Sequence, residues 1–300
     1  MKREIKVGML ISYDYELAKN SLPLIYDHAD KIVLAVDKDG KTWAGNDLHI
    51  SDEFWQWIKD FDTQQKIEIY RDSFYVEGLT TMECDTRERT MLSDYMGKGG
   101  WHIQIDADEY FIHFKHFVDF LHDLDREKRH INRVIVEWLI LYKRTASGFL
   151  FIKETGGKCL YNPFATTTPR YVSAREISRP HRTILYPQRV IHDSYARSEQ
   201  DLWTKLSNWS HNSDFDVDGY FHYWKAINEK NYMFVRNFAP VEPYDAWEEL
   251  GYLEGKSIQD VIQTARTSSL IVAKRKRRLI RYLSWCVPPI LVKLYKILFK

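Results

Sequence analysis

Three carboxylates follow an apolar run within four positions of the chain, at Asp106, Asp108 and Glu109. The run from Trp101 to Ile105 predicts a buried strand that ends where the acids begin. Side chains alternate along a strand, so Asp106 and Asp108 should point to the same side of the backbone. Carboxylates held this close repel each other unless a cation lies between them. The pattern predicts a divalent metal site that also holds a negatively charged ligand, with a polar loop as the alternative.

Strand and helix patterns alternate around this motif. Apolar, β-branched runs predict strands at 6–12, 31–36, 66–70, 101–106 and 133–142. Helical spacing and capping residues predict helices at 17–28, from Ser51 to Phe61, from Thr80 or Thr81 to Met96, at 114–124, at 198–209, and from Ser257 far into the tail. This alternation is typical of a parallel sheet with helices on both faces. We therefore predict an α/β fold with a mostly parallel, Rossmann-like sheet and a C-terminal helical extension.

Acids stand at or just beyond three of the predicted strand ends. Asp14 follows the first strand, Asp37 ends the second, and Asp106 with Asp108 ends the strand that carries the motif. Ligands of open α/β sheets bind outside the carboxyl ends of the strands. We therefore expect these acids to face one crevice. For Asp37 the alternative is an acid that starts a turn.

The remaining sequence limits the possible classes of function. Cys84, Cys159 and Cys286 are far apart, which predicts free thiols in a reducing compartment and argues against zinc. The polar N-terminus argues against a signal peptide. Residues 145–190 have no clear period and contain several prolines, so we expect irregular strands and loops there, where an acceptor could be recognised.

Four segments give the chain a likeness to a known family: Ser12-Tyr13-Asp14-Tyr15-Glu16, Ile32-Val33-Leu34-Ala35-Val36-Asp37, Ile105-Asp106-Ala107-Asp108-Glu109 and Arg189-Val190-Ile191-His192. Their order and spacing resemble those of nucleotide-sugar glycosyltransferases of the GT-A fold, in particular the large family-two group. The resemblance covers roughly residues 5–240. We therefore expect a GT-A-like domain over 1–240 and a C-terminal helical region over 241–300.

The resemblance implies a role for several residues of the crevice. Tyr13, Asp14 and Asp37 would contact the nucleoside, and Arg89 in the helix before the motif would face the nucleotide, with Arg87 as its neighbour. The metal would be Mn²⁺ or Mg²⁺. By the same resemblance, Asp108 would bind the metal directly, Asp106 would assist, and His192 would complete the site.

The catalytic base has no clear signature in this sequence. An inverting transferase needs a carboxylate that takes the proton of the acceptor hydroxyl. The family arrangement places an acid before the late histidine, and Glu176 is the nearest match. Glu154 and Asp193 are rivals, and the stereochemical outcome stays open.

The C-terminal tail is basic and amphipathic. From Val261 to Lys300 there are ten Lys or Arg residues and no acid, whereas the first 260 residues carry 33 basic and 42 acidic side chains. Apolar residues recur at helical spacing after the cluster Lys274–Arg278, but Pro288 and Pro289 interrupt the segment. Its apolar stretch is shorter than the about 20 residues of a membrane span. We expect the tail to lie on an anionic lipid surface, with packing on the domain or a nucleic-acid patch as alternatives.

Together these features predict a metal-dependent glycosyltransferase. It would move a sugar from a nucleoside diphosphate sugar to a glycan or a lipid-linked acceptor in surface polysaccharide or lipopolysaccharide synthesis. It would be cytoplasmic and peripheral on the inner face of the cell membrane, without a nucleic-acid partner. Two alternatives remain: a haloacid dehalogenase-like phosphotransferase, whose strand also ends in Asp-x-Asp, and a non-catalytic sugar- or lipid-binding scaffold on the same fold.

Overall fold

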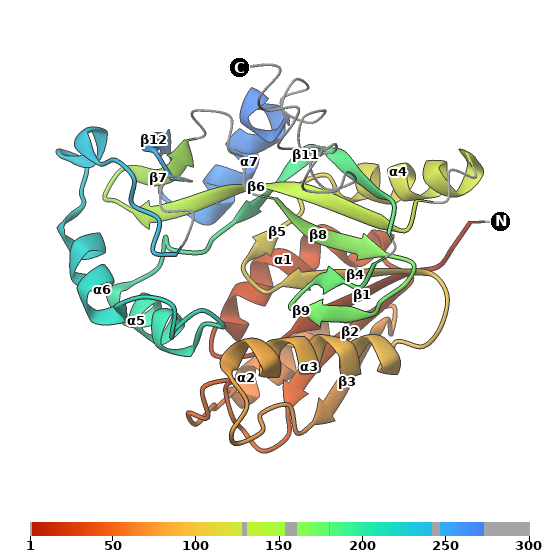
Figure 1. The fold of residues 1–300 in the computed structure, drawn as a ribbon. Helices are drawn as coiled ribbons and strands as arrows, with labels where there is room; N and C mark the ends of the chain where they lie inside the picture. Colours follow the sequence, from red (N-terminus) through yellow and green to blue (C-terminus); the bar gives the residue numbers. More distant parts are fainter. Residues whose placement is uncertain (1, 128–130, 154–160, 180, 242–246, 273–300) are drawn as a thin grey trace, which may run out of the picture.

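A ten-stranded mixed sheet runs through the part of the chain that the structure describes (Figure 1). The structure is a computed structural model that describes residues 2–127, 131–153, 161–179, 181–241 and 247–272. Its main path has the order β12-β7-β6-β8-β4-β1-β2-β3, and β11 pairs with β6 and β5. The strands are β1 (Ile5–Leu10), β2 (Lys31–Asp37), β3 (Ile67–Asp72), β4 (Trp101–Asp106), β5 (Glu109–Tyr110), β6 (Arg133–Arg144), β7 (Gly148–Lys153), β8 (Tyr161–Thr166), β11 (Thr183–His192) and β12 (Glu249–Glu254); β9 (Tyr171–Ser173) and β10 (Glu176–Ile177) form a separate hairpin.

Helices cover both faces of this sheet. They are α1 (Ala18–Ile25), α2 (Asp52–Phe61), α3 (Thr81–Tyr95), α4 (Phe114–Glu127), α5 (Glu199–Asn208), α6 (Val217–Ala226) and α7 (Ile258–Thr267). Short 3₁₀ turns occupy η1 (Tyr15–Leu17), η2 (Tyr26–His28), η3 (Tyr232–Phe234) and η5 (Ser269–Ile271). The predicted α/β class with a Rossmann-like sheet is therefore confirmed.

The N-terminal half of the sheet is parallel and fixes where its strand ends lie. β1 pairs in parallel with β2 and with β4, and β2 pairs in parallel with β3. The register places Leu10 opposite Asp106, and Asp37 opposite Asp72. The carboxyl ends of these strands therefore meet at one edge of the sheet, as the sequence predicted.

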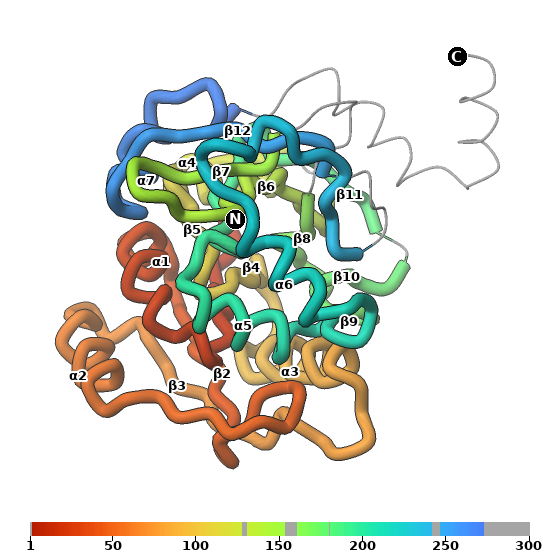
Figure 2. Tube along the Cα trace, turned by 90° about the vertical axis from the view of Figure 1, so that its left-hand side faces the viewer, coloured from red at the N-terminus to blue at the C-terminus, as the bar shows by residue number. Residues whose placement is uncertain are grey.

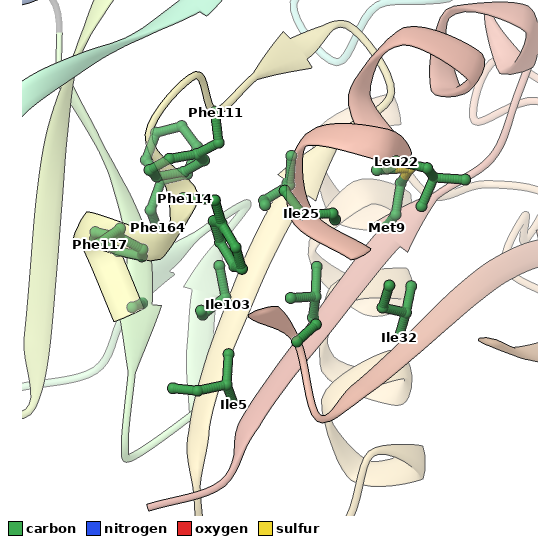
Figure 3. Packing of buried hydrophobic residues seen from close by; sticks show 14 of the residues in the cluster. Ile5, Met9, Leu22, Ile25, Ile32, Ile103, Phe111, Phe114, Phe117 and Phe164 are labelled. Atoms are coloured by element: carbon green, nitrogen blue, oxygen red, sulfur yellow. The ribbon is translucent and has the colours of Figure 1, made fainter. Parts of the chain in front are cut away.

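Alternation of side chains gives β1, β2 and β4 two buried faces, whereas the edge strand β3 is only partly buried. Ile5, Val7 and Met9 of β1 pack with α1, α2 and α4 in the largest cluster of the core (Figure 3). Leu10 points the other way and packs with Leu92 of α3 in a second cluster. Figure 1 shows α3 on the near side of the strands and α1 behind them. The sheet is thus held between helices on both sides, which buries β1, β2 and β4 almost completely.

The C-terminal half is more mixed than the sequence predicted. The stretch 145–190, expected as irregular strands and loops, contains β7, β8, the β9–β10 hairpin and most of β11. β8 runs antiparallel to β4 and β6, whereas β11 runs parallel to β6 with a shift in register between Leu185 and Arg189. Pro187 lies inside that shift, which explains why a simple alternating pattern does not reveal the strand.

The predicted helix starts are mostly confirmed. The side chains of Ser51, Thr80, Ser198 and Ser257 accept the capping hydrogen bonds of α2, α3, α5 and α7. The expectation of a long helix from Ser257 into the tail is wrong, because α7 ends at Thr267 and a 3₁₀ turn follows. The rest of the tail, including Lys274–Arg278, lies outside the described residues.

The segment beyond residue 240 contributes to the sheet itself. β12 pairs antiparallel with β7, and α7 packs on Leu139, Leu141 and Phe149. The predicted domain boundary at residue 240 stays a prediction. Within the described ranges, no helix combines the length and the apolar character that crossing a membrane requires.

Substitution of one buried and one exposed phenylalanine tests how much the core contributes to the free energy of unfolding. Phe117 of α4 is fully buried against Phe111 and Tyr186, whereas Phe234 is 77% exposed. Phe117→Ala should lower the free energy of unfolding by about 3–5 kcal/mol, because it removes buried apolar surface and leaves a cavity. Phe234→Ala should change it by less than about 0.5 kcal/mol. Urea denaturation measures both, and equal effects would contradict this description of the core.

Candidate functional site

A cavity of about 360 Å³ opens where β1 and β4 end. Its wall includes Ser12, Tyr13 and Asp14 beyond β1, and Asp106 and Asp108 at the end of β4. The structure thus brings together the two acidic segments that the sequence predicted to share a crevice. Its aromatic residues are Tyr13, Trp43, Trp138, Tyr161, Tyr195, Trp209 and Trp247.

The turn after β4 fixes the acids by a local hydrogen bond. The backbone N–H of Asp106 donates to the Glu109 carboxylate at 2.8 Å, which closes the turn around Ala107. Glu109 itself is fully buried. β5 then pairs with β11 so that His192 lies opposite Glu109, and the backbone N–H of Asp193 donates to the carbonyl of Asp108 at 2.8 Å. This pairing carries His192 to the cavity wall.

Asp108 is buried and bound by two cationic side chains. Its Oδ2 accepts hydrogen bonds from Arg197 at 2.5 Å and from Lys205 at 2.7 Å. Its Oδ1 lies 3.5 Å from Nε2 of His192. The same Arg197 nitrogen also donates to Asp14 at 3.0 Å. Arg197 therefore joins the segment after β1 to the acid after β4.

Asp106 is bound by two arginines from different parts of the chain. Arg89 of α3 donates to Asp106 Oδ1 at 3.0 Å, and it also holds Asp85 at 2.6 Å. Arg175 lies 2.5 Å from Asp106 Oδ2 and forms two further hydrogen bonds to Glu109, at 2.7 and 3.0 Å. Both oxygens of Asp106 therefore contact guanidinium groups, while 33% of its side-chain surface stays exposed.

The β9–β10 hairpin delivers Arg175 from its turn. Ala174 has a φ of 44°, in the left-handed region that costs a non-glycine residue energy. Its N–H donates to the hydroxyl of Thr86 on α3 at 2.8 Å, which holds the turn in place. A strained backbone supported in this way is typical of a functional site. Ala174 and Arg175 both line the cavity.

Helix α5 supplies Lys205 to the cavity wall and is anchored at both ends. Ser198 caps its start, one residue after Arg197. At its end, the side chain of Asn208 accepts hydrogen bonds from Thr42 at 2.6 Å and from Asn46 at 2.9 Å. The hydroxyl of Thr81 at the start of α3 donates to the carbonyl of Ser210 just beyond α5 at 3.0 Å, and Figure 2 shows the β9–β10 hairpin beside α3. Three separate segments thus bring their cations to the acids of β4.

Electrostatics keep both motif acids charged. Burial alone would raise the pKa of Asp108, but the charges of Lys205, His192 and Arg197 hold it well below its usual range. Burial is likewise outweighed at Asp106, where Arg175 and Arg89 lower the pKa. At Glu109 burial prevails and raises the pKa.

A divalent ion between these acids does not fit the contacts that they already make. Five carboxylates (Asp14, Asp85, Asp106, Asp108, Glu109) face four cations (Arg89, Arg175, Arg197, Lys205), so their charges nearly cancel. Nδ1 of His192 is buried without a hydrogen-bond partner among the described residues, whereas a metal-bound histidine normally has its second nitrogen fixed. No group of three or more His, Cys, Asp or Glu in the described ranges is arranged to hold an ion. The metal at Asp106, Asp108 and His192 stays a prediction that these contacts oppose.

Other predicted residues lie away from the cavity wall. Asp37 accepts four backbone N–H groups, from Asp39, Lys41, Phe74 and Tyr75, at 2.7–3.1 Å. These bonds use its lone pairs to organise the loops after β2 and β3, which matches the alternative of a turn-starting acid.

The predicted base is also placed elsewhere. Glu176 forms an ion pair with the buried Arg133 and does not line the cavity. Asp193 is buried beside Tyr110, whose hydroxyl donates to it at 3.2 Å, and it lines a second cavity instead. Glu154 lies outside the described residues. Arg87 donates to the carbonyl of Ser73, whereas Arg89 lines the main cavity.

Sequence reasoning missed three of the four cations. Arg175, Arg197 and Lys205 belong to segments that follow the motif by 67 or more positions, and no spacing rule connects them to it. One signal was present: Arg197 and Lys205 both follow closely on His192, which the sequence did single out.

Comparisons with known proteins give little help with function. No protein-family model and no curated protein matches the sequence. Among solved structures, the chain is similar to 4-diphosphocytidyl-2C-methyl-D-erythritol synthase, with 12% identity, a TM-score of 0.31, and coverage of 55% of this chain and 74% of the other. It is also similar to mannose-1-phosphate geranyltransferase from Thermus thermophilus, with 10% identity, a TM-score of 0.25, and coverage of 55% and 50%. Likenesses this weak carry no argument about function.

A buried acid behind the cavity makes a pH prediction. Glu88 of α3 accepts a hydrogen bond from Nε1 of Trp43 at 2.6 Å, and burial raises its pKa to about 8. In the unfolded chain the Glu88 carboxyl loses its proton near pH 4.3, whereas in the folded protein it keeps the proton up to about pH 8. Glu88 therefore costs stability as the pH rises, by at most about 1.4 kcal/mol per pH unit. In urea titrations, Glu88→Gln should flatten the fall in unfolding free energy from about pH 5 to 8. Parallel curves for both proteins would contradict this.

Proposed function

We propose that this protein is a transferase that moves a sugar from a nucleoside diphosphate sugar to a hydroxyl-bearing acceptor. The proposal is carried by one observation: the carboxyl ends of β1 and β4 place two acidic segments and a set of buried cations around a single cavity lined with aromatic rings. It agrees with the resemblance to GT-A glycosyltransferases of family two. Under that proposal, residues 1–240 form the transferase domain.

The wall after β1 and near α3 suits a nucleoside. Ser12, Tyr13 and Asp14 offer hydroxyls and a carboxylate that can accept hydrogen bonds from ribose or a base. Trp43 and Trp209 offer flat apolar surfaces on which a base can stack. Trp43 is held in place by its hydrogen bond to Glu88.

The cations suit the diphosphate that leaves during transfer. Negative charge develops on its oxygens as the bond to the sugar breaks, and preorganised donors in a dry cavity stabilise that charge. Arg89, Arg175 and Lys205 line the cavity and are held by buried carboxylates. Because they are already oriented, they would need little rearrangement when charge develops.

Another part of the same wall suits a sugar. Trp138, Tyr161 and Trp247 present aromatic surfaces, and Asn162 presents an amide that can donate and accept hydrogen bonds. Trp138 is fixed by the hydrogen bond from its Nε1 to Glu109 at 2.9 Å. A rigid aromatic wall next to the cations is the arrangement that a donor sugar or an acceptor glycan requires.

The proposal also includes the acceptor and the cellular location, and both depend on the basic C-terminal tail, most of which lies outside the described residues. The ten basic residues after Val261 would place the chain on the inner, anionic face of a cell membrane. A lipid-linked acceptor in surface polysaccharide or lipopolysaccharide synthesis would then be within reach. The C-terminal region from 241 would serve this attachment.

Nucleotide binding tests the proposed function directly. The full-length chain is heated with UDP, GDP, CDP, ADP or dTDP, each in EDTA and in Mn²⁺, and its melting temperature is recorded. At about 100 times its dissociation constant, a bound nucleotide should stabilise the fold by about 2.7 kcal/mol and raise the melting temperature by several degrees. The matching nucleotide sugar should also be hydrolysed slowly.

A pair of tryptophan variants locates the binding site. Trp43→Ala should weaken binding of the active nucleotide at least about tenfold, because a stacking surface is lost. Trp203→Ala on the outer side of α5 is the matched control and should leave binding unchanged, since Trp203 does not line the cavity. If no nucleotide of the panel shifts the melting temperature in either buffer, the proposed function is wrong. Binding without hydrolysis of any donor would favour the non-catalytic scaffold.

A further inference from the structure

We infer that Lys205 supplies the positive charge for the diphosphate of the donor, in the place where a resident divalent ion would otherwise bind at Asp108. This inference rests on the proposed function and deepens it. It predicts that the protein binds its nucleotide, and acts on the nucleotide sugar, without a divalent metal.

A divalent ion at Asp108 would compete with the protein's own cations for Oδ2, while Oδ1 faces Nε2 of His192 at 3.5 Å. Asp108 Oδ2 already accepts charged hydrogen bonds from Arg197 and Lys205. An ion at this oxygen would have to displace at least one of them and so remove a charged partner from a buried cation, which is strongly destabilising. The other acid of the motif is paired as well, because Arg89 and Arg175 contact both oxygens of Asp106.

Lys205 differs from the three arginines because the described residues use only one of its N–H donors. Arg197 bridges Asp14 and Asp108, and Arg175 bridges Asp106 and Glu109. Lys205 forms one hydrogen bond with the described residues, to Asp108. An ammonium group has three N–H donors, so two remain for a ligand. Lys205 also lines the cavity, whereas Arg197 lies behind its wall and faces the second cavity.

Burial and the anchoring of α5 hold Lys205 in a fixed position. Its side chain is 8% exposed, and the end of α5 is held by the hydrogen bonds of Thr42 and Asn46 to Asn208. A lysine on a fixed helix, held by one buried carboxylate, can point its remaining donors at phosphate oxygens without a large loss of side-chain entropy. Charge-assisted hydrogen bonds of this kind are roughly twice as strong as neutral ones. Lys205 can therefore do for the leaving group what a hard cation would do.

Nucleotide titration with and without metal separates the two possibilities. The full-length chain is titrated calorimetrically with UDP and GDP, in EDTA and in Mn²⁺. For the nucleotide that binds, the wild-type dissociation constant should differ by less than about threefold between the two buffers. Lys205→Gln should weaken binding in EDTA by at least about tenfold, and Lys205→Arg, which keeps the charge, should retain most of it.

Mn²⁺ binding without nucleotide gives a second readout, measured by electron paramagnetic resonance. Wild-type protein should leave Mn²⁺ free in solution, whereas Lys205→Gln releases Asp108 Oδ2 and should bind Mn²⁺ at least about tenfold more tightly. Lys6→Gln is the matched control, because Lys6 is also buried but bonds the carbonyls of Gly97 and Lys98, away from the cavity. It should alter neither nucleotide nor Mn²⁺ binding.

The outcomes distinguish this inference from the proposed function. If chelation abolishes nucleotide binding, or if wild-type protein binds Mn²⁺ as tightly as Lys205→Gln does, Lys205 does not replace a metal and the inference is overturned while the function stands. If no nucleotide binds in either buffer, the proposed function fails. The Mn²⁺ spectra then still decide whether lysine or metal occupies Asp108.

Discussion

The ion pairs of Arg197 with Asp14 and Asp108 are the interaction on which the rest of the site depends. One guanidinium nitrogen contacts both acids, at 3.0 and 2.5 Å. Those acids come from the loop after β1 and the turn after β4, and Arg197 directly precedes α5. A single side chain therefore fixes the relative position of three segments that are far apart in sequence. Without it, the segment that carries His192 and the helix that carries Lys205 would lose a charged attachment to the acidic edge of the sheet.

Such a network is stable only when every buried charge has a partner. Each carboxylate of the motif would be expensive to bury alone, and removing one member strands the others at a cost of about 3–5 kcal/mol. Here the partners come from α3, from the β9–β10 turn, and from the segment around α5. The chain therefore couples the shape of the cavity to the packing of its C-terminal half. Because the charges of these acids and of their cationic partners nearly cancel, the surface can accept a phosphate-bearing ligand that brings its own negative charge.

The sequence predicted the parts of this arrangement that depend on local periodicity. The parallel strands from β1 to β4, their common edge, and the caps at Ser51, Thr80 and Ser198 follow from alternation and capping rules, and the structure has them. The convergence of Asp14 with Asp106 and Asp108 also followed, because parallel strand ends meet at one edge. The partners of these acids could not be predicted. Arg175 reaches them from the β9–β10 hairpin and Arg197 from the segment after β11, and Pro187 breaks the alternating pattern of that strand. A repulsive pair of acids indicates that a cation is needed, but it does not show whether a metal or a side chain provides it.

A double-mutant cycle between Arg197 and Asp108 tests the central claim most directly. The free energy of unfolding is measured by urea denaturation for the wild type, Arg197→Met, Asp108→Asn and the double variant. If the protein's own cations neutralise the motif, each single change should be destabilising and the double variant should be far less destabilised than their sum, with a coupling of about 1.5–3 kcal/mol. Additive effects, with a coupling near zero, would show that Arg197 does not balance Asp108 and would contradict the account.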